Sequence, residues 1–206
     1  MRYVFKRLFG EEFKELVLLN LLTAALCLPV VTAGPALLAL TGTMINILDN
    51  RCGLSRVKEF RSLFKEKFWK GVALEACVGA YGALLVWCVS LARAVPRGSG
   101  ILLAAVMLAG FLAAIVSVCL TAVLAGTELK FGEALWNAAC LALGRLPRAA
   151  LAAAFAYGLG YAAILLYPIS VLLYVILMIS CTQVLVVAAL WPALDELILP
   201  DSDGAA

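Results

Sequence analysis

Histidine is missing from this 206-residue sequence, and charged residues make up only 14% of it. Without imidazole, the chain lacks the commonest general base and the commonest zinc ligand in proteins. The sequence also has no P-loop and no zinc motif, so the usual machinery for phosphoryl transfer or metal-assisted catalysis is missing. We therefore expect no enzymatic activity, no cofactor and no metal site.

The seven cysteines give no sign of a metal cluster or a disulfide framework. They are scattered along the chain without a C-x-x-C pair, and six of them lie in apolar surroundings, where cysteine behaves as a small hydrophobic residue. The formal net charge of the chain is small, at +3, and the basic residues of the chain are clustered. Nucleic-acid binding is therefore not expected, and we interpret the clusters as membrane topology signals.

Hydrophobic residues are abundant instead, at 65% of the chain. Soluble domains carry about 45–50% apolar residues, so this excess predicts that lipid is the solvent. Long uncharged runs predict where the chain crosses the bilayer. The last run would form a helix of about 69 Å, more than twice the hydrocarbon core, so we expect it to fold back at Tyr167-Pro168. The predicted transmembrane helices are 71–92, 101–126, 149–167 and 169–193.

The first uncharged run, residues 16–48, is interrupted by Pro29 and by Gly34-Pro35. Its two halves would be only about 24 Å and 21 Å long as helices, and one long tilted span is the rival interpretation. Basic clusters both precede and follow the run, and the positive-inside rule favours a hairpin that returns both clusters to the cytoplasm. We therefore predict a Pro-broken helical hairpin, with both chain termini cytoplasmic. A cleaved signal peptide is disfavoured by the acidic residues that precede the run.

Three amphipathic segments carry aromatic or aliphatic residues on one face and basic residues on much of the rest. Such helices typically lie in the lipid headgroup layer, although a docking surface for a cytoplasmic partner is the alternative. The predicted fold is a single all-α integral membrane domain over residues 1–206. The remaining segments are the amphipathic stretches 1–15, 51–70 and 128–147 on the cytoplasmic side and the acidic tail 194–206.

Several motifs are similar to those of the YesL family of bacterial membrane proteins. The stretch LVLLNLLTAALCLPVVTAGPALLAL resembles the family's N-terminal signature, and FRSLFKEKFWKG and NAACLALGRLPRAAL resemble two later segments. Lys67 departs from the pattern, where a polar residue such as asparagine is expected. The resemblance implies a multi-pass protein of the bacterial plasma membrane with unknown activity. Relatives of this kind are often found beside genes for carbohydrate uptake and sensing, which favours a transport-associated role.

The broken hairpin also suggests a ligand site. In the simpler interpretation, residues 30–34 form a turn near the outer surface. In the other, the N-terminus of the second helix points its free N–H groups at a polar or anionic ligand, as broken helices in transporters do. Thr41, Thr43 and Asn46 could also line that site. The candidate ligand-binding residues are Asn20, Pro29, Thr32, Gly34, Pro35 and Glu75.

Glu75 is the only ionisable residue clearly inside a predicted span. Such residues usually face a cavity or a partner. The alternatives here are a pair with Lys70, contact with the lipid headgroups, or a role with substrate or protons. Taken together, the sequence predicts a small carrier or an accessory subunit linked to carbohydrate uptake. The alternative is a membrane-embedded regulatory or scaffold protein without a substrate. Expected partners are the lipid bilayer, a transporter subunit or sensor protein at the cytoplasmic face, and a second copy of the chain.

Overall fold

The computed structural model describes residues 13–48, 55–94, 99–165 and 179–198. Within these residues every regular element is helical, in agreement with the predicted all-α class. The elements are α2 (Phe13–Cys27), η1 (Val30–Thr32), α3 (Ala33–Leu48), α4 (Arg56–Glu66), α5 (Phe68–Ala94), α6 (Ser99–Gly126), α7 (Phe131–Gly144), α8 (Leu146–Leu165) and α10 (Ile179–Ile198). The predicted fold-back at Tyr167-Pro168, most of the segment 1–15 and the end of the acidic tail lie outside the described residues.

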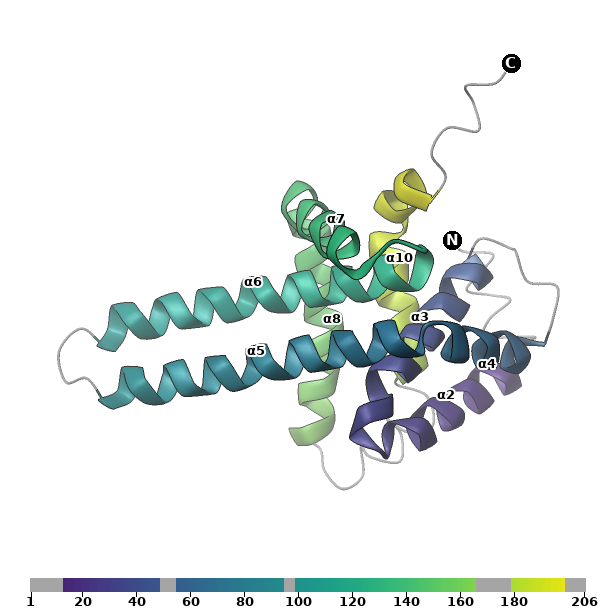
Figure 1. Cartoon of the computed structure of the whole chain (residues 1–206), viewed down its shortest axis with the longest axis horizontal. Coiled ribbons are helices and arrows are strands. Elements are labelled where there is room, and N and C mark those ends of the chain that lie inside the picture. The colour runs from purple at the N-terminus through teal and green to yellow at the C-terminus, as the bar shows by residue number, and fades with distance from the viewer. Residues whose placement is uncertain (1–12, 49–54, 95–98, 166–178, 199–206) are drawn as a thin grey trace, which may run out of the picture.

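Helices α5 and α6 form a long antiparallel pair that projects from the rest of the molecule (Figure 1). Both are long and apolar enough to cross a membrane, and they cover the predicted spans 71–92 and 101–126. Large apolar side chains on their outer halves are exposed, among them Val86, Trp87, Ile101 and Phe111. Exposed apolar area of this extent is expected where lipid, rather than water, covers the surface. The length and the exposed apolar surface of α5 and α6 therefore support the prediction that the chain is a membrane protein.

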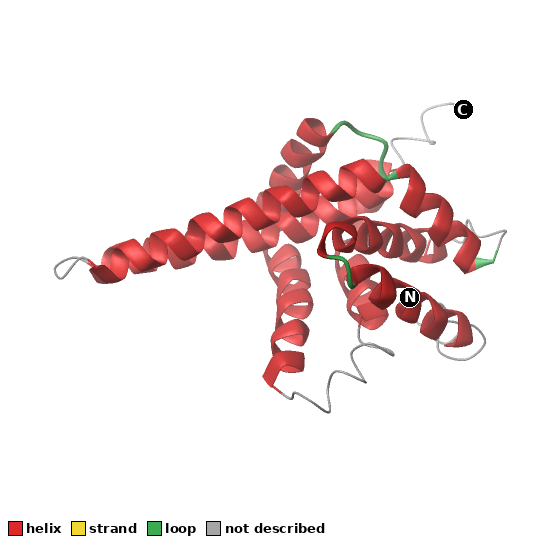
Figure 2. Cartoon of the chain, turned by 60° about the horizontal axis from the view of Figure 1, so that its bottom comes forward, coloured by secondary structure: helices red, strands yellow, loops and turns green. Residues whose placement is uncertain are grey.

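The second half of the chain is less regular than four equal spans. Helices α7 and α8 are bent by 107° where they meet, and they make a third candidate span only if the bent pair is counted as one. Pro147 lies in the first turn of α8, where a missing N–H is tolerated. Helix α8 packs against α10, and together they cross the α5–α6 pair steeply (Figures 1 and 2). The predicted count of four full transmembrane helices therefore stays a prediction.

Pro29 ends the first helix of the N-terminal pair. Helix α2 stops at Cys27, and the following residues tighten into η1 before α3 begins at Ala33. The hydroxyl of Thr32 donates to the carbonyl oxygens of Leu26 and Pro29, and the second of these bonds is 2.9 Å long. The bond to Leu26 satisfies a carbonyl that the proline-broken helix leaves without an intrahelical partner. The Pro29 carbonyl also accepts the backbone N–H of Thr32 over 3.0 Å. Thr32 therefore stabilises the turn itself.

The chain reverses direction between α2 and α3. The evidence is that α4 contacts both the start of α2 and the end of α3. Glu15 of α2 lies 3.9 Å from the guanidinium of Arg56 in α4. At the far end of α3, the Asn46 amide donates to Glu59 of α4 over 2.6 Å. Two points far apart along the hairpin thus meet the same short helix.

Helix α3 is the central element of the described structure. It packs against α2, α4, α5, α6 and α10, and nearly all its side chains from Ala36 to Ile47 are buried. The apolar stripe of α4 faces this core: Phe60 is buried, and Phe64 packs on the core cluster. The aromatic residues of α4 expected to lie among lipid headgroups therefore pack largely within the protein. Of its basic residues, Lys58, Arg61 and Lys65 remain exposed, whereas Arg56 is buried.

Candidate functional site

Two glycines bring α3 and α5 into backbone contact. A Cβ atom added to Gly71 would lie 2.5 Å from the backbone N and Cα of Pro35, and one added to Gly34 would lie 2.3 Å from the carbonyl oxygen of Gly71. No side chain fits at such distances, so glycine is required at both positions for this crossing. The contact places the first turn of α3 directly beside the turn of α5 that carries Glu75.

Glu75 binds the N-terminus of α3. The backbone N–H of Gly34 donates to Oε2 of Glu75 over 2.9 Å. The first N–H groups of a helix have no intrahelical partner and carry the positive end of its dipole, so a carboxylate is favoured there. Gly71 and Glu75 lie four positions apart and therefore share one face of α5. Lys70, which the sequence offered as a partner for Glu75, instead lies 3.3 Å from Glu128.

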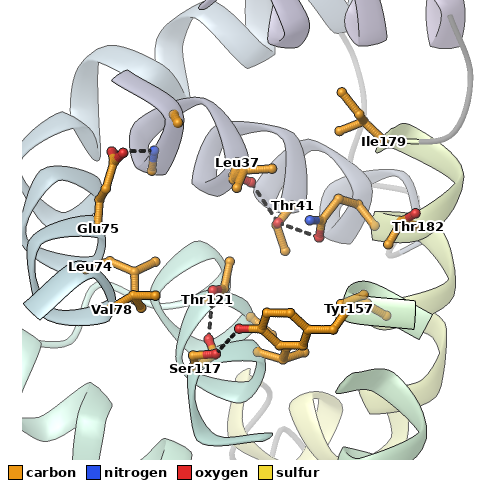
Figure 3. Close-up of a pocket in the computed structure, with 18 of the residues that line it drawn as sticks. Leu37, Thr41, Leu74, Glu75, Val78, Ser117, Thr121, Tyr157, Ile179 and Thr182 are labelled. Carbon is orange, nitrogen blue, oxygen red and sulfur yellow. Dashed lines mark hydrogen bonds between the residues drawn. The ribbon is translucent and has the colours of Figure 1, made fainter. Parts of the chain in front are cut away.

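A cavity of about 650 Å³ lies beside this contact, among α3, α5, α6, α8 and α10 (Figure 3). Its volume is within the range of small-molecule sites in proteins. It reaches the α2–α3 turn through Val31, Ala33 and Gly34. Most of its lining is aliphatic. The polar side chains that line it are Thr41, Glu75, Ser117, Thr121, Tyr157, Thr182 and Gln183.

Hydroxyl groups make short hydrogen bonds along the cavity wall. Thr41 Oγ1 lies 2.7 Å from the carbonyl oxygen of Leu37 and 3.0 Å from Oε1 of Gln183, so its single proton is shared between two acceptors. Across the cavity, the hydroxyls of Ser117 and Tyr157 are 2.7 Å apart (Figure 3). These groups come from four helices and supply both donors and acceptors to anything held between them.

The structure brings only some of the predicted site residues together. Gly34 and Glu75 line the cavity, and Pro35 packs on Gly71 behind them. Thr32 and Pro29 belong to the turn, and Asn20 is fully buried on α2; none of these three lines the cavity. The further candidates divide in the same way. Thr41 lines the cavity, whereas Thr43 bonds the carbonyl of Ala39 and Asn46 bonds Glu59.

Sequence reasoning missed Gly71, Ser117, Thr121 and Tyr157. Ser117 and Thr121 lie four residues apart in an otherwise apolar span, so they share one helix face, and this spacing was a usable signal. For Tyr157 no comparable signal exists, because a single tyrosine in an apolar helix is equally consistent with an interfacial position.

Lys67 forms a second polar centre, at the C-terminal end of α6. Its buried ammonium group donates to the carbonyl oxygens of Leu124, Ala125 and Thr127 at 3.1, 2.7 and 3.3 Å. It also lies 3.1 Å from Oε1 of Glu128. The last carbonyls of a helix lack intrahelical partners and carry its negative dipole end, which favours a cation there. The residue that departs from the YesL pattern thus has a defined structural role.

Glu128 joins this centre to the start of α5, since its carboxylate contacts both Lys67 and Lys70. Partial burial alone would raise the pKa of Glu128. The hydrogen bond and charge of Lys67, together with those of Lys70, outweigh that effect and hold its pKa below the ordinary value. The carboxylate is therefore ionised at neutral pH and completes the junction between α5, α6 and the segment leading to α7.

The model of a family described as proteins of unknown function, DUF624, matches residues 16–89, which run from α2 into α5. No curated protein and no solved structure shows significant similarity to the chain. The matched region contains the α2–α3 turn, the Gly34–Gly71 contact and Glu75, and the family carries no assigned activity.

Proposed function

We propose that the chain is a multi-pass protein of the bacterial plasma membrane that binds a small molecule in the cavity beside Glu75 and assists its transport. It acts either as a small carrier or as an accessory subunit of an uptake system. We further propose membership of the YesL group, four full spans and cytoplasmic termini, which the sequence motifs and the distribution of basic residues support.

The observation that carries this proposal is the cavity. It lies against a broken helix pair, it has the volume of a small-molecule site, and it combines an aliphatic wall with one carboxylate and several hydroxyls. Transporters of several folds place their substrate sites beside interrupted helices in this way. A membrane protein that served only as a scaffold would have no need for such a cavity.

The link to carbohydrate uptake rests on the family resemblance. A free sugar presents hydroxyl groups around its whole ring, and burying them requires a dense set of hydrogen-bond partners. The mainly aliphatic lining favours a more apolar molecule. We therefore propose that any role in sugar uptake is that of an accessory subunit, while the cavity of this chain holds a different ligand.

Two glycines of α5 offer a matched test. Gly79 lines the cavity and Gly82, one turn further along, does not; a Cβ atom added at either would meet nothing within 4 Å. Gly79→Phe should place a ring in the cavity, and Gly82→Phe should add the same ring outside it. The wild-type chain and both variants would be purified from native membranes in lipid nanodiscs and examined by mass spectrometry for bound small molecules.

We expect one small molecule to copurify with the wild type and with Gly82→Phe, and to fall at least tenfold in Gly79→Phe. Uptake of that molecule into proteoliposomes or whole cells would then distinguish a carrier from an accessory subunit. Equal retention by Gly79→Phe, or the absence of any bound molecule from all three proteins, would contradict the proposal.

The alternative function, a membrane-embedded regulatory or scaffold protein, has one specific observation in its favour. Helix α4 buries Phe60 against the core and leaves Lys58, Arg61 and Lys65 exposed on its outer face. Such a basic face can hold an acidic segment of a transporter subunit or sensor protein. Crosslinking from native membranes, compared with a variant in which all three residues are replaced by serine, would detect that partner.

A further inference from the structure

Glu75 alone carries a charge among the described residues that line the cavity. One of its oxygens, Oε2, accepts the Gly34 N–H, while Oε1 has no hydrogen-bond partner within the described part of the chain. Two neighbouring cations are engaged elsewhere, Lys67 with the end of α6 and Lys70 with Glu128. The N-terminus of α3 contributes only about half a positive charge, which is less than the full negative charge of the Glu75 carboxylate. The cavity therefore retains a net negative charge beside Glu75.

Two tryptophans on α5 define the depth of the cavity. Trp69 and Trp87 are 79% and 64% exposed. They are separated by five full helical turns, so they lie on one face and about 27 Å apart, close to the roughly 30 Å thickness of the hydrocarbon core. Tryptophan is enriched at both membrane interfaces. The part of α5 that lines the cavity, residues 72–79, lies between these two levels and nearer to Trp69.

The residues at the mouth of the cavity are apolar or amphipathic and exposed. Ala76, Val78 and Gly79 supply the α5 side, and Tyr157, 50% exposed, lies across from them on α8 (Figure 3). With α5 spanning the bilayer, this opening faces the acyl chains of the leaflet on the Trp69 side. A ligand that enters there is itself dissolved in the membrane.

We propose that the ligand is an amphiphile with an aliphatic body and a protonated amine head, taken from that leaflet, with Glu75 as its counter-ion. This inference rests on the proposed function, since it identifies the chemistry of the same cavity. The amine donates to the second oxygen of Glu75, and the chain packs on the aliphatic wall. An unpaired charge at this depth is strongly disfavoured, so pairing stabilises both the amine and the carboxylate. A carboxylate head would meet Glu75 as a like charge and be excluded.

The test uses three probes with the same twelve-carbon chain and a mid-chain diazirine, ending in an amine, a hydroxyl or a carboxylate. The full-length protein in phosphatidylcholine nanodiscs is photolabelled, and the labelled peptides are identified by mass spectrometry. Butylamine, which shares the amine but stays in water, is added as a competitor. The variants are Glu75→Gln, whose amide oxygen can still accept the Gly34 N–H, and Glu66→Gln, which removes an exposed carboxylate on α4.

We expect the amine probe to label cavity peptides of α3, α5 or α8 at least tenfold more than the carboxylate probe, with the hydroxyl probe between them. Glu75→Gln should abolish the preference of amine over hydroxyl, Glu66→Gln should preserve it, and excess butylamine should not compete. Equal cavity labelling by all three heads, or an unchanged preference in Glu75→Gln, would overturn the amine assignment while leaving the binding cavity intact. Competition by butylamine would overturn entry from the leaflet.

Failure of the proposed function itself has a different signature. The amine probe would then give the same labelling in Gly79→Phe as in Gly82→Phe, or no probe would label the cavity peptides at all. The two proposals can therefore fail separately.

Discussion

The backbone nitrogen of Gly34 lies 2.9 Å from Oε2 of Glu75, a residue on another helix 41 positions later in the chain. The start of α3, which the sequence offers as a site for an external anion, is thus occupied by the protein's own carboxylate. This bond and the glycine contact beside it join α3 to α5 at one wall of the cavity. The relationship couples the broken hairpin to a helix long enough to span the membrane.

Substitution of Gly71 by alanine should destabilise the protein. The new methyl group would meet Pro35 at 2.5 Å, where only backbone atoms could move. Overpacking of this kind typically lowers the free energy of unfolding by about 1–3 kcal/mol. Gly82→Ala, with open space around the added atom, should be neutral or stabilising by up to about 1 kcal/mol. Denaturant unfolding of both variants in the same detergent would measure the difference, and equal stability would contradict the close crossing.

Lys67→Met should remove the cap of α6. The methionine keeps much of the side-chain volume but leaves three carbonyl oxygens without their charged donor, at an expected loss of about 1.5–3 kcal/mol in unfolding free energy. Lys70→Met is the matched control, because Lys70 is more exposed and bonds only Glu128. Its loss should stay below about 1 kcal/mol. The structural role of Lys67 would be refuted if both variants lost the same amount.

Protonation of Glu128 at acidic pH should lower the free energy of unfolding. Its pKa is lower in the folded protein than in the unfolded chain, so the unfolded chain binds more protons between these two values and stability rises with pH there. The contribution is therefore complete above the unfolded pKa and disappears as the pH falls through the folded pKa. In Glu128→Gln this component of the pH dependence should vanish, as measured by denaturant unfolding across acidic pH. If the fall in unfolding free energy at acidic pH were the same in Glu128→Gln as in the wild type, Glu128 would be excluded as its source.

The membrane arrangement can be tested with single cysteines in a background without the seven native ones. Lys14→Cys and Lys65→Cys should react from the same side with a membrane-impermeant maleimide, because the chain reverses between α2 and α3. Arg93→Cys, at the far end of α5, should react from the opposite side. Labelling of Lys14→Cys and Lys65→Cys from opposite sides would disprove the hairpin topology.

Local chemistry made several features predictable. Pro29 is expected to end or kink the first helix, because proline removes a backbone donor and clashes with the preceding turn, and α2 does stop at Cys27. Long runs such as residues 101–126 are too apolar for water, which is a property of composition and needs no tertiary information. The importance of Gly34 and Glu75 was also visible, since a break beside Gly34 and a charge within a span are both unusual.

Other features depended on how the helices cross. No pattern in the sequence fixes whether Glu75 meets Lys70 or Gly34, because both partners are within reach until α3 and α5 are packed together. Lys67 could be assigned no role from its neighbours in the chain, since the carbonyl oxygens it binds are almost 60 positions away. Ser117 and Tyr157 became part of one wall only when α6 and α8 met.

The sequence by itself therefore determined three features: long helices suited to lipid rather than water, the all-helical class, and the interruption of the first apolar run. These follow from transfer free energies and backbone sterics acting over a few residues. Only the tertiary structure decided which charge neutralises which helix end and where a cavity is left between helices. The physical reason is that the charge pairing and the cavity depend on how closely segments distant in the sequence approach one another. The contact of Gly34 with Gly71 fixes the distance between α3 and α5.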